Sequence, residues 1–263
     1  MADQPLLELH DIDKRFGPVD VLKKVQFSAR AGEVTALVGD NGAGKSTLVK
    51  CISGTYNIDG GEYLFEGRPV TVHTPRDASA LGIEIVYQDL ALCDNLDIVQ
   101  NMFLGRERMR GLVLNETSME HAATETLASL SVRTVKSVRQ RVSSLSGGQR
   151  QTVAIAKAVL WNSKLVVLDE PTAALGVAQT EQVLELVRRL ADRGLAVVLI
   201  SHNMTDVLRV ADEIAVLYLG ETAAQVRRTD INQQQLVELI TTGRLSDPGD
   251  TNLSNSPASE ASA

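Results

Sequence analysis

The sequence predicts an α/β protein with a mixed, mostly parallel sheet, an N-terminal antiparallel β subdomain and an inserted helical subdomain. Three observations support this fold class. Alternating apolar and polar residues near the N-terminus are typical of half-buried strands. Continuous apolar runs at 34–38, 165–168 and 196–200 are typical of strands buried in a parallel sheet. Strand signals stop between residues 90 and 164, where helical patterns fill the interval.

Composition limits the possible functions. The 263 residues are 44% hydrophobic and 22% charged, with a net charge of -7, which argues against nonspecific nucleic-acid binding. No apolar run approaches the roughly 20 residues that cross a bilayer, and the N-terminus lacks a secretory pattern. The two cysteines, Cys51 and Cys93, have no metal-ligand spacing and are expected to be free thiols. A soluble cytoplasmic protein is therefore expected.

The first run, 34–38, leads into a glycine-rich loop and then a helix, which is the P-loop arrangement. Its glycines allow backbone N–H groups to face a polyphosphate, and the helix N-terminus adds unpaired donors. Lys45 is expected between the β- and γ-phosphates, and the Ser46 hydroxyl on Mg²⁺. The alternative is a glycine turn that happens to precede Lys-Ser. We predict an ATP site and a P-loop NTPase core, with the binding residues Gly39, Asp40, Asn41, Gly42, Ala43, Gly44, Lys45, Ser46 and Thr47.

The other elements that precede the inserted helical subdomain are predicted from local sequence signals. Thr74 as N-cap and Pro75 at the first helical position open a short helix that Gly82 ends. Strands are predicted at 6–12, 19–27, 62–65, 70–72 and 83–86.

The rest of the chain is expected to form an inserted helical lobe, the second part of the core and a C-terminal tail. Residues 89–161 are expected to form the helical lobe, and its basic segment 133–141 is expected to be solvated. Residues 1–88 and 162–243 are expected to form the core, so that 1–243 is one domain. Residues 244–263 have almost nothing to bury and are predicted to be disordered. The core helices and final hairpin are predicted at 177–193, 204–210, 232–241, 213–219 and 222–226.

Two adjacent carboxylates end the apolar run at 165–168. The carboxyl ends of parallel strands are where α/β sheets bind ligands. We assign Asp169 to the metal ion and Glu170 to the general base that accepts a proton from the attacking water. A strand ending in Asp-Glu is by itself common and mostly structural, but beside a complete P-loop the functional interpretation is stronger.

A third motif, Leu-Ser-Gly-Gly-Gln at 145–149, places Ser146 and two glycines at a helix start. This is either a capped helix or a second anion site. The order of P-loop, this motif, the strand ending Asp-Glu and the strand ending Ser-His resembles the ABC-type ATPase family from about residue 6 to 243. In that family two cassettes pair head to tail, and each ATP lies between one P-loop and the partner's copy of the motif at 145–149, which is called the signature.

The resemblance implies further roles. Ser146, Gly147 and Gly148 would contact the γ-phosphate of ATP held by the partner, with Gln149 in the same site. Gln88 would touch Mg²⁺ and the attacking water, and His202 the γ-phosphate. Phe16, which spacing alone assigns to packing, would stack on adenine. Asp40 is expected to point away from the phosphates, because its charge would be repelled there.

One position departs from the family pattern: Gly176 stands where Asp is usual, and that Asp helps to join the two subunits. The stretches 39–42, 73–78, 87–90, 101–107 and 172–177 resemble monosaccharide importers, in which the Gly176 departure can be a subgroup habit. Many of those importers fuse two cassettes in one chain. No internal repeat is visible here, so a second copy, as a homodimer, or another cassette is expected to complete the sites.

The resulting hypothesis is an ATPase subunit of a simple-sugar ABC importer, peripheral on the inner face of the cell membrane. Its expected cofactors are ATP and Mg²⁺, and its expected partners are membrane permease subunits and an external sugar-binding protein. Nucleic acid is not expected. The alternative is a soluble ABC-type switch acting on a non-membrane partner. A regulatory binder that holds ATP without hydrolysing it is a further alternative, against which Glu170 and His202 argue.

Overall fold

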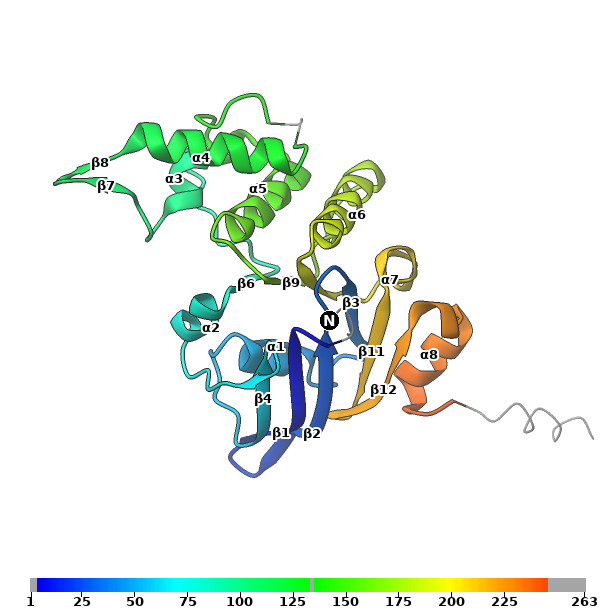
Figure 1. The fold of residues 1–263 in the computed structure, drawn as a ribbon. Coiled ribbons are helices and arrows are strands. Elements are labelled where there is room, and N and C mark those ends of the chain that lie inside the picture. The colour runs from blue at the N-terminus through cyan, green and yellow to red at the C-terminus, as the bar shows by residue number, and fades with distance from the viewer. Residues whose placement is uncertain (1–3, 133–134, 246–263) are drawn as a thin grey trace, which may run out of the picture.

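The computed structural model describes residues 4–132 and 135–245. Its larger sheet has the strand order β12-β11-β3-β10-β9-β6, and every neighbouring pair is parallel except β11 with β12 (Figure 1). Strands buried on both faces need continuous apolar sequence, and this explains the apolar runs in the chain. The six strands are β3 (Val34–Gly39), β6 (Ile83–Val86), β9 (Leu165–Asp169), β10 (Ala196–Ile200), β11 (Glu213–Tyr218) and β12 (Glu221–Arg227).

The smaller sheet is antiparallel with the order β2-β1-β4-β5. Its strands are β1 (Leu7–Phe16), β2 (Val19–Ala29), β4 (Gly60–Phe65) and β5 (Arg68–Pro69). The prediction of a strand at 70–72 was wrong, because pairing with β4 ends at Pro69. Val72 is buried instead beside Gly54, so the chain has already turned toward helix α2 (Pro75–Leu81).

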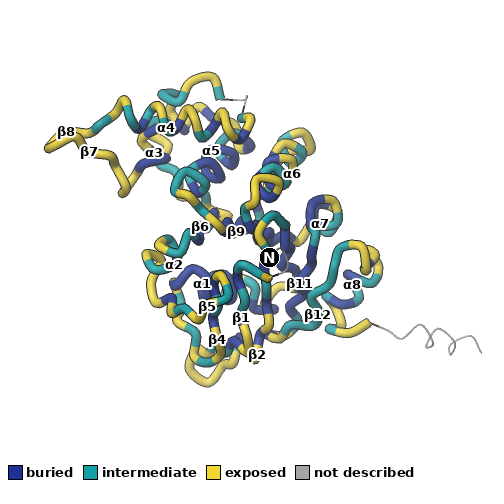
Figure 2. Tube along the Cα trace, viewed as in Figure 1, coloured by how far each residue is buried: buried dark blue, intermediate teal, exposed yellow. Residues whose placement is uncertain are grey.

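Helix α1 (Lys45–Ile52) lies between the two sheets. Its Leu48, Val49 and Ile52 pack in one cluster with Leu9 of β1 and Val198 of β10. This cluster joins the antiparallel subdomain to the core and fixes the direction in which the P-loop helix starts. The dark buried segments of Figure 2 follow the strands of the larger sheet and the inner sides of the helices.

The helices α3 (Ile98–Phe103), α4 (Glu116–Ser129) and α5 (Gly147–Val159) follow β6 and precede β9, which are neighbours in the sheet. The chain therefore leaves the sheet at the carboxyl end of β6 and returns at the amino end of the neighbouring parallel strand β9, beside the start of β6. The three helices stand apart from the smaller sheet (Figure 1). The prediction that strand signals stop over 90–164 was wrong at one place. A short hairpin, β7 (Met109–Arg110) and β8 (Val113–Leu114), joins α3 to α4.

The basic segment between α4 and α5 has a specific role at Arg139. Its guanidinium pairs with Asp97, Glu116 and Glu120, so it ties the start of α3 to the first turns of α4. Glu120 and then Asp97 raise the pKa of Arg139. A fully solvated segment is therefore the wrong description of this residue. Residues 133–134, and residues 246–263 of the predicted disordered tail, lie outside the described ranges.

Four more helices complete the core. Helix α2 (Pro75–Leu81) begins with the predicted Thr74 cap, here a capping box with Asp77. The others, α6 (Val177–Asp192), α7 (Met204–Val210) and α8 (Gln233–Thr242), agree with the sequence prediction to within two residues. No helix in the described ranges is long and apolar enough to cross a membrane.

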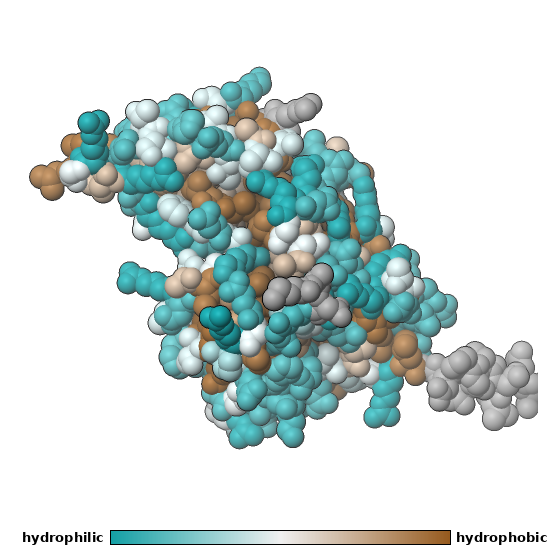
Figure 3. Space-filling view, viewed as in Figure 1, coloured by the Kyte–Doolittle hydropathy of each residue, from teal (hydrophilic) through white to brown (hydrophobic). Residues whose placement is uncertain are grey.

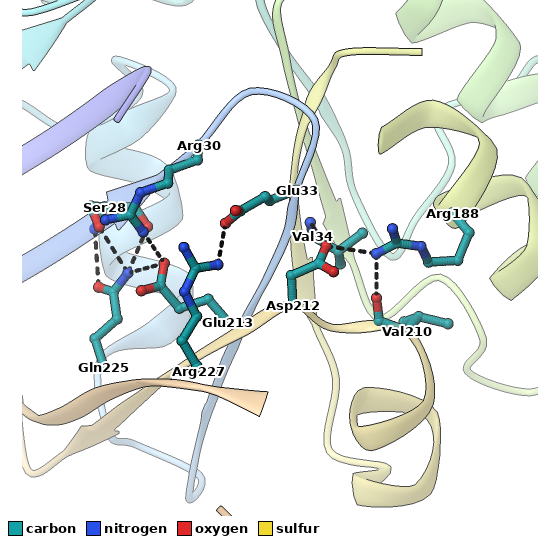
Figure 4. A network of polar contacts seen from close by, with 10 residues as sticks. All are labelled: Ser28, Arg30, Glu33, Val34, Arg188, Val210, Asp212, Glu213, Gln225 and Arg227. Atoms are coloured by element: carbon teal, nitrogen blue, oxygen red, sulfur yellow. Dashed lines mark hydrogen bonds and ion pairs between the residues drawn. The ribbon is translucent and has the colours of Figure 1, made fainter. Parts of the chain in front are cut away.

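A polar network ties α6 and both sheets together at the edge where β3 begins (Figure 4). Arg188 of α6 donates to Asp212 and to the carbonyl of Val210, and Asp212 also accepts from the N–H of Val34. On the other side, Gln225 of β12 bonds Ser28 of β2. The network therefore holds the sheet at the edge opposite the P-loop.

Candidate functional site

Three neighbouring strands end at one edge of the sheet with polar residues. Strand β10 lies between β3 and β9 and is parallel to both. The P-loop follows β3, Asp169 ends β9 with Glu170 directly after it, and His202 follows β10. Parallel strands place their carboxyl ends at the same edge, so these three segments meet because of the strand order.

The P-loop depends on glycine at defined positions. Gly39, Gly42 and Gly44 have φ angles of 152°, 82° and 105°, which L side chains rarely adopt. A Cβ on Gly39 would also lie 2.3 Å from the carbonyl oxygen of Leu217 on β11. Asp40 is exposed and its carboxylate accepts from the N–H of Asn41. Asp40 also lines the cavity that contains His202, so the expectation that it points outward stays a prediction.

Lys45 spans the mouth of this loop. Its ammonium donates to the carbonyls of Gly39 and Asp40 at 2.8 and 2.9 Å. Burial lowers the pKa of Lys45, while the charges of Glu170, Asp40 and Asp169 act in the opposite direction. The cation is thus half-buried among acidic groups, where a polyphosphate is the matching ligand.

Glu170 and His202 are in direct contact. The Nδ1 atom of His202 lies 2.9 Å from Oε2 of Glu170, while most of the imidazole is exposed. Glu170 has a φ of 49°, and its N–H donates to the carbonyl of Ile200 on β10. A left-handed conformation at a non-glycine residue is uncommon and is held here by that cross-strand bond. The carboxylate is therefore directed toward the segment that follows β10.

Two adjoining cavities surround these groups. The first, of about 380 Å³, is lined by Lys45, Ser46, Gln88, Asp169 and Glu170 among others. The second, of about 500 Å³, shares Asn41 and Glu170 with the first and adds His202. The structure thus brings together the predicted P-loop, the two carboxylates, Gln88 and His202.

Asp169 is partly buried beside Glu170. Burial and the neighbouring carboxylate raise the pKa of Asp169, and the charges of Lys45 and Lys50 oppose this rise. The described residues contain no group of three or more His, Cys, Asp or Glu side chains that would hold a metal alone. Oxygen donors are nevertheless present in the first cavity as the Ser46 hydroxyl, the Gln88 amide and the Asp169 carboxylate. Magnesium accepts such a set when phosphate oxygens and waters supply the remaining ligands.

The signature segment begins α5, with Ser146 as the N-cap. The Ser146 hydroxyl accepts from the N–H of Gln149, and the Gln149 amide oxygen accepts in return. Ser146 and Gly147 are exposed, so the helix start faces outward. None of the described residues 145–149 lines either of the two cavities around Lys45 and His202. The structure does not bring the signature to its own P-loop.

The signature packs instead against the segment that follows Glu170. A Cβ on Gly147 would lie 3.2 Å from Leu175, and one on Gly148 would lie 3.0 Å from Gln179. Gln179 also caps α6, because its side-chain oxygen accepts from the N–H of Gly176 at 2.9 Å. Gly176, which stands where the family usually has Asp, therefore lies next to the signature of its own chain.

Phe16 ends β1 and remains 41% exposed. Tyr56 packs edge-on against it with ring centroids 5.0 Å apart, and the Lys14 ammonium lies 5.4 Å from the ring centroid. An aromatic face fixed in this way and accessible to solvent is suited to stacking.

Sequence reasoning also missed two features around Glu170 and His202. Thr172 donates to the buried carboxylate of Asp206, which links the segment after Glu170 to α7. Apolar residues of α7 and α8, Met204, Val237 and Ile240, line the second cavity. Neither feature has a motif, although Asp206, an acidic residue in the first turn of a short helix, was a visible signal.

Comparisons with known proteins agree with this site. The ABC transporter family model matches residues 22–173. The xylose/arabinose import ATP-binding protein XylG of Sulfolobus acidocaldarius is 45% identical over 90% of this chain and 94% of its own length. The fructose import ATP-binding protein FrcA of Rhizobium meliloti is 44% identical over 92% and 95%. The ribose import ATP-binding protein RbsA of Yersinia pestis is 39% identical over 94% of this chain but 48% of its own length.

Solved structures agree on the fold. A nucleotide-free ATP-binding cassette from an ABC transporter has a TM-score of 0.77 and 25% identity, covering 93% of this chain and 96% of that one. An ATP-binding cassette in its ADP conformation has a TM-score of 0.78 and 26% identity over 91% and 96%. The sequence relatives, the family model and the P-loop NTPase fold all lead to one conclusion. The chain belongs to the ABC transporter family and is a nucleotide-binding ATPase of that family.

Proposed function

We propose that this chain is the ATP-hydrolysing subunit of an importer for a simple sugar, acting with separate membrane subunits and an external sugar-binding protein. The observation that carries the proposal is the similarity to XylG and FrcA, which extends over at least nine-tenths of each chain. The three relatives described above are all named for sugar import, which favours an importer over a soluble switch. In this proposal the chain acts at the inner face of the membrane.

The chemistry assigned to the site is in-line transfer of the γ-phosphoryl group of ATP to water. The bond from the γ-phosphorus to the β–γ bridging oxygen breaks, and ADP and phosphate leave. Lys45 and the N–H groups of the P-loop bind the phosphates and stabilise the charge that develops on them. Mg²⁺, held by Ser46, Asp169 and Gln88, would supply further neutralisation of the phosphate charge.

Glu170 is assigned as the base that accepts the proton of the attacking water. Its contact with His202 supports this role, because a carboxylate held by a hydrogen bond has one defined orientation. His202 also lines the second cavity, and its exposed ring would contact the γ-phosphate of bound ATP in this proposal. Phe16 provides the stacking surface for adenine.

A second cassette completes each site in this proposal. The support is the position of Ser146 and Gly147, exposed at the start of α5 and absent from the lining of their own chain's cavities. In a head-to-tail pair, this helix start would meet the γ-phosphate bound by the partner. Hydrolysis would then open the pair and transmit the motion to the membrane subunits.

The test is the ATPase rate per subunit as a function of protein concentration. Wild type should show a rate that rises with concentration, and Lys45→Ala and Glu170→Gln should abolish it. Glu170→Gln should retain ATP binding, whereas Lys45→Ala should lose most of it. A concentration-independent rate would refute the shared site. If the wild type is inactive alone and inactive with its membrane subunits, the ATPase assignment fails.

A further inference from the structure

The β7–β8 hairpin projects from the end of the helical lobe, away from both sheets (Figure 1). It consists of residues 109–114, with Gly111 and Leu112 in the turn. Leu112 is 99% exposed and Val113 65%, while Met109 and Leu114 are about half exposed. Figure 3 shows apolar residues at the tip of this projection, with hydrophilic residues behind them.

The base of the hairpin is anchored although its tip has no apolar cover within the described chain. The N–H of Asn115 donates to the carbonyl of Arg108, and the N–H of Arg108 contacts the sulfur of Met119. The guanidinium of Arg108 bonds Ser118 and lies over the ring of Phe103. The four apolar side chains are therefore presented on a fixed ribbon, a pattern that marks a binding surface.

The charge around the tip is opposite to that of the chain. Residues 109–114 contain Arg110 and no acidic residue, a formal charge of +1, whereas the chain has -7. Arg106 pairs with Glu84, and the N–H of Gly105 donates to Glu107 and lowers its pKa. Arg110 is exposed in the ribbon itself, next to the apolar turn.

We propose that this hairpin inserts its apolar tip into the headgroup region of an anionic lipid bilayer, with Arg110 at the lipid phosphates. The inference rests on the proposed function, which places the chain at the inner membrane face. The positive charge of the hairpin decides between a lipid surface and a membrane subunit as its binding partner. The inner leaflet is negative, whereas cytoplasmic loops of membrane proteins carry an excess of Lys and Arg and would repel this hairpin. A basic, apolar and projecting element therefore matches lipid better than a membrane subunit.

Because the hairpin is short, its contact with the bilayer orients the helical lobe and is not the main attachment of the chain to the membrane. Four apolar side chains reach only the headgroup boundary, and binding by so few is weak and reversible. A contact at this distance from the sheet would nevertheless resist rotation of the lobe when the chain is docked on membrane subunits. Because the contact depends on charge, it should weaken as salt rises.

The test is cosedimentation of the full chain with vesicles of phosphatidylcholine alone or with 30% phosphatidylglycerol, without nucleotide. Partitioning should be at least tenfold stronger on the anionic vesicles. The Leu112→Ser/Val113→Ser double variant and Arg110→Glu should each reduce it about tenfold. Leu219→Asn is the matched control, because it removes a 66% exposed apolar side chain from a different hairpin.

Two results would overturn the proposal. One is equal partitioning of wild type, both hairpin variants and Leu219→Asn. The other is absence of vesicle binding by a wild type whose capture by purified membrane subunits depends on Leu112. The Lys45→Ala variant separates this inference from the proposed function, since it should bind vesicles like wild type even though it hydrolyses no ATP. Failure of ATPase activity therefore leaves the vesicle result interpretable.

Discussion

His202 Nδ1 lies 2.9 Å from Oε2 of Glu170, and the two residues follow the adjacent parallel strands β10 and β9. The geometry is set by two features of the backbone. Glu170 takes a left-handed conformation at φ 49°, and its N–H is held by the carbonyl of Ile200, two residues before His202. A base oriented by a neighbouring ring is an arrangement that supports proton abstraction from water.

His202→Ala should lower the ATPase rate by about 100-fold, the lower part of the range for a positioned acid–base group. ATP affinity should change less than tenfold, because the P-loop and Phe16 are untouched. The measurement is single-turnover hydrolysis together with nucleotide binding. His121→Ala is the control, since His121 is an exposed histidine on α4 that pairs only with Glu125 in the described structure. Equal rates for the two variants would remove His202 from the reaction.

Gly39 and Gly42 offer a second test, within one loop. Both have positive φ, but a Cβ at Gly39 would overlap the Leu217 carbonyl, whereas at Gly42 nothing lies within 4 Å. Gly42→Ala should cost about 1 kcal/mol of unfolding free energy from backbone strain alone. Gly39→Ala should cost at least about 2 kcal/mol, because displacement of β11 is added. Urea denaturation measures both, and equal losses would show that β11 does not restrict this turn.

Much of this architecture was predictable because its signals are local. The capping box at Thr74, the apolar runs and the P-loop each require few residues, and each appears where it was predicted. The β7–β8 hairpin was missed because its exposed apolar residues do not alternate as a half-buried strand does. The strand order that brings Glu170 to His202 depends on long-range pairing, which no local pattern contains.

The site residues also differ in how far the sequence alone could assign them. Lys45 and Asp169 were assigned from chemistry and spacing, while Phe16, Gln88 and His202 required resemblance to a family. Tyr56, which fixes Phe16, was not predicted at all, because edge-on ring packing between a strand end and a loop leaves no sequence pattern. The roles assigned to these residues remain predictions.

Asp169 should make stability fall as pH rises. Burial and Glu170 raise the pKa of Asp169 in the folded chain above its ordinary value. Between the two pKa values the folded state binds the proton more tightly than the unfolded state, so the free energy of unfolding decreases with rising pH. Asp169→Asn removes this titration. Its stability relative to wild type should therefore improve from pH 4 to pH 7, while ATPase activity is lost.

Urea denaturation of both proteins at several pH values checks this, with nucleotide and Mg²⁺ omitted. The control is Asp192→Asn, which alters a mostly exposed aspartate at the end of α6. A constant difference between wild type and Asp169→Asn across this range would mean that Asp169 titrates at its ordinary pKa. A difference that moves in the opposite direction would mean that Lys45 and Lys50 outweigh burial.

Thr172 and Asp206 should be energetically coupled. The hydroxyl of Thr172 donates to the Asp206 carboxylate at 2.9 Å, and Asp206 is only 7% exposed. A double-mutant cycle of Thr172→Val and Asp206→Asn should give a coupling of about 0.5–3 kcal/mol in unfolding free energy. Because this bond joins the segment after Glu170 to the helix after His202, each single variant should also reduce kcat more than it raises KM. Thr205→Val serves as the control on the same helix. Additive stability losses would mean that this bond does not couple the segment after Glu170 to α7.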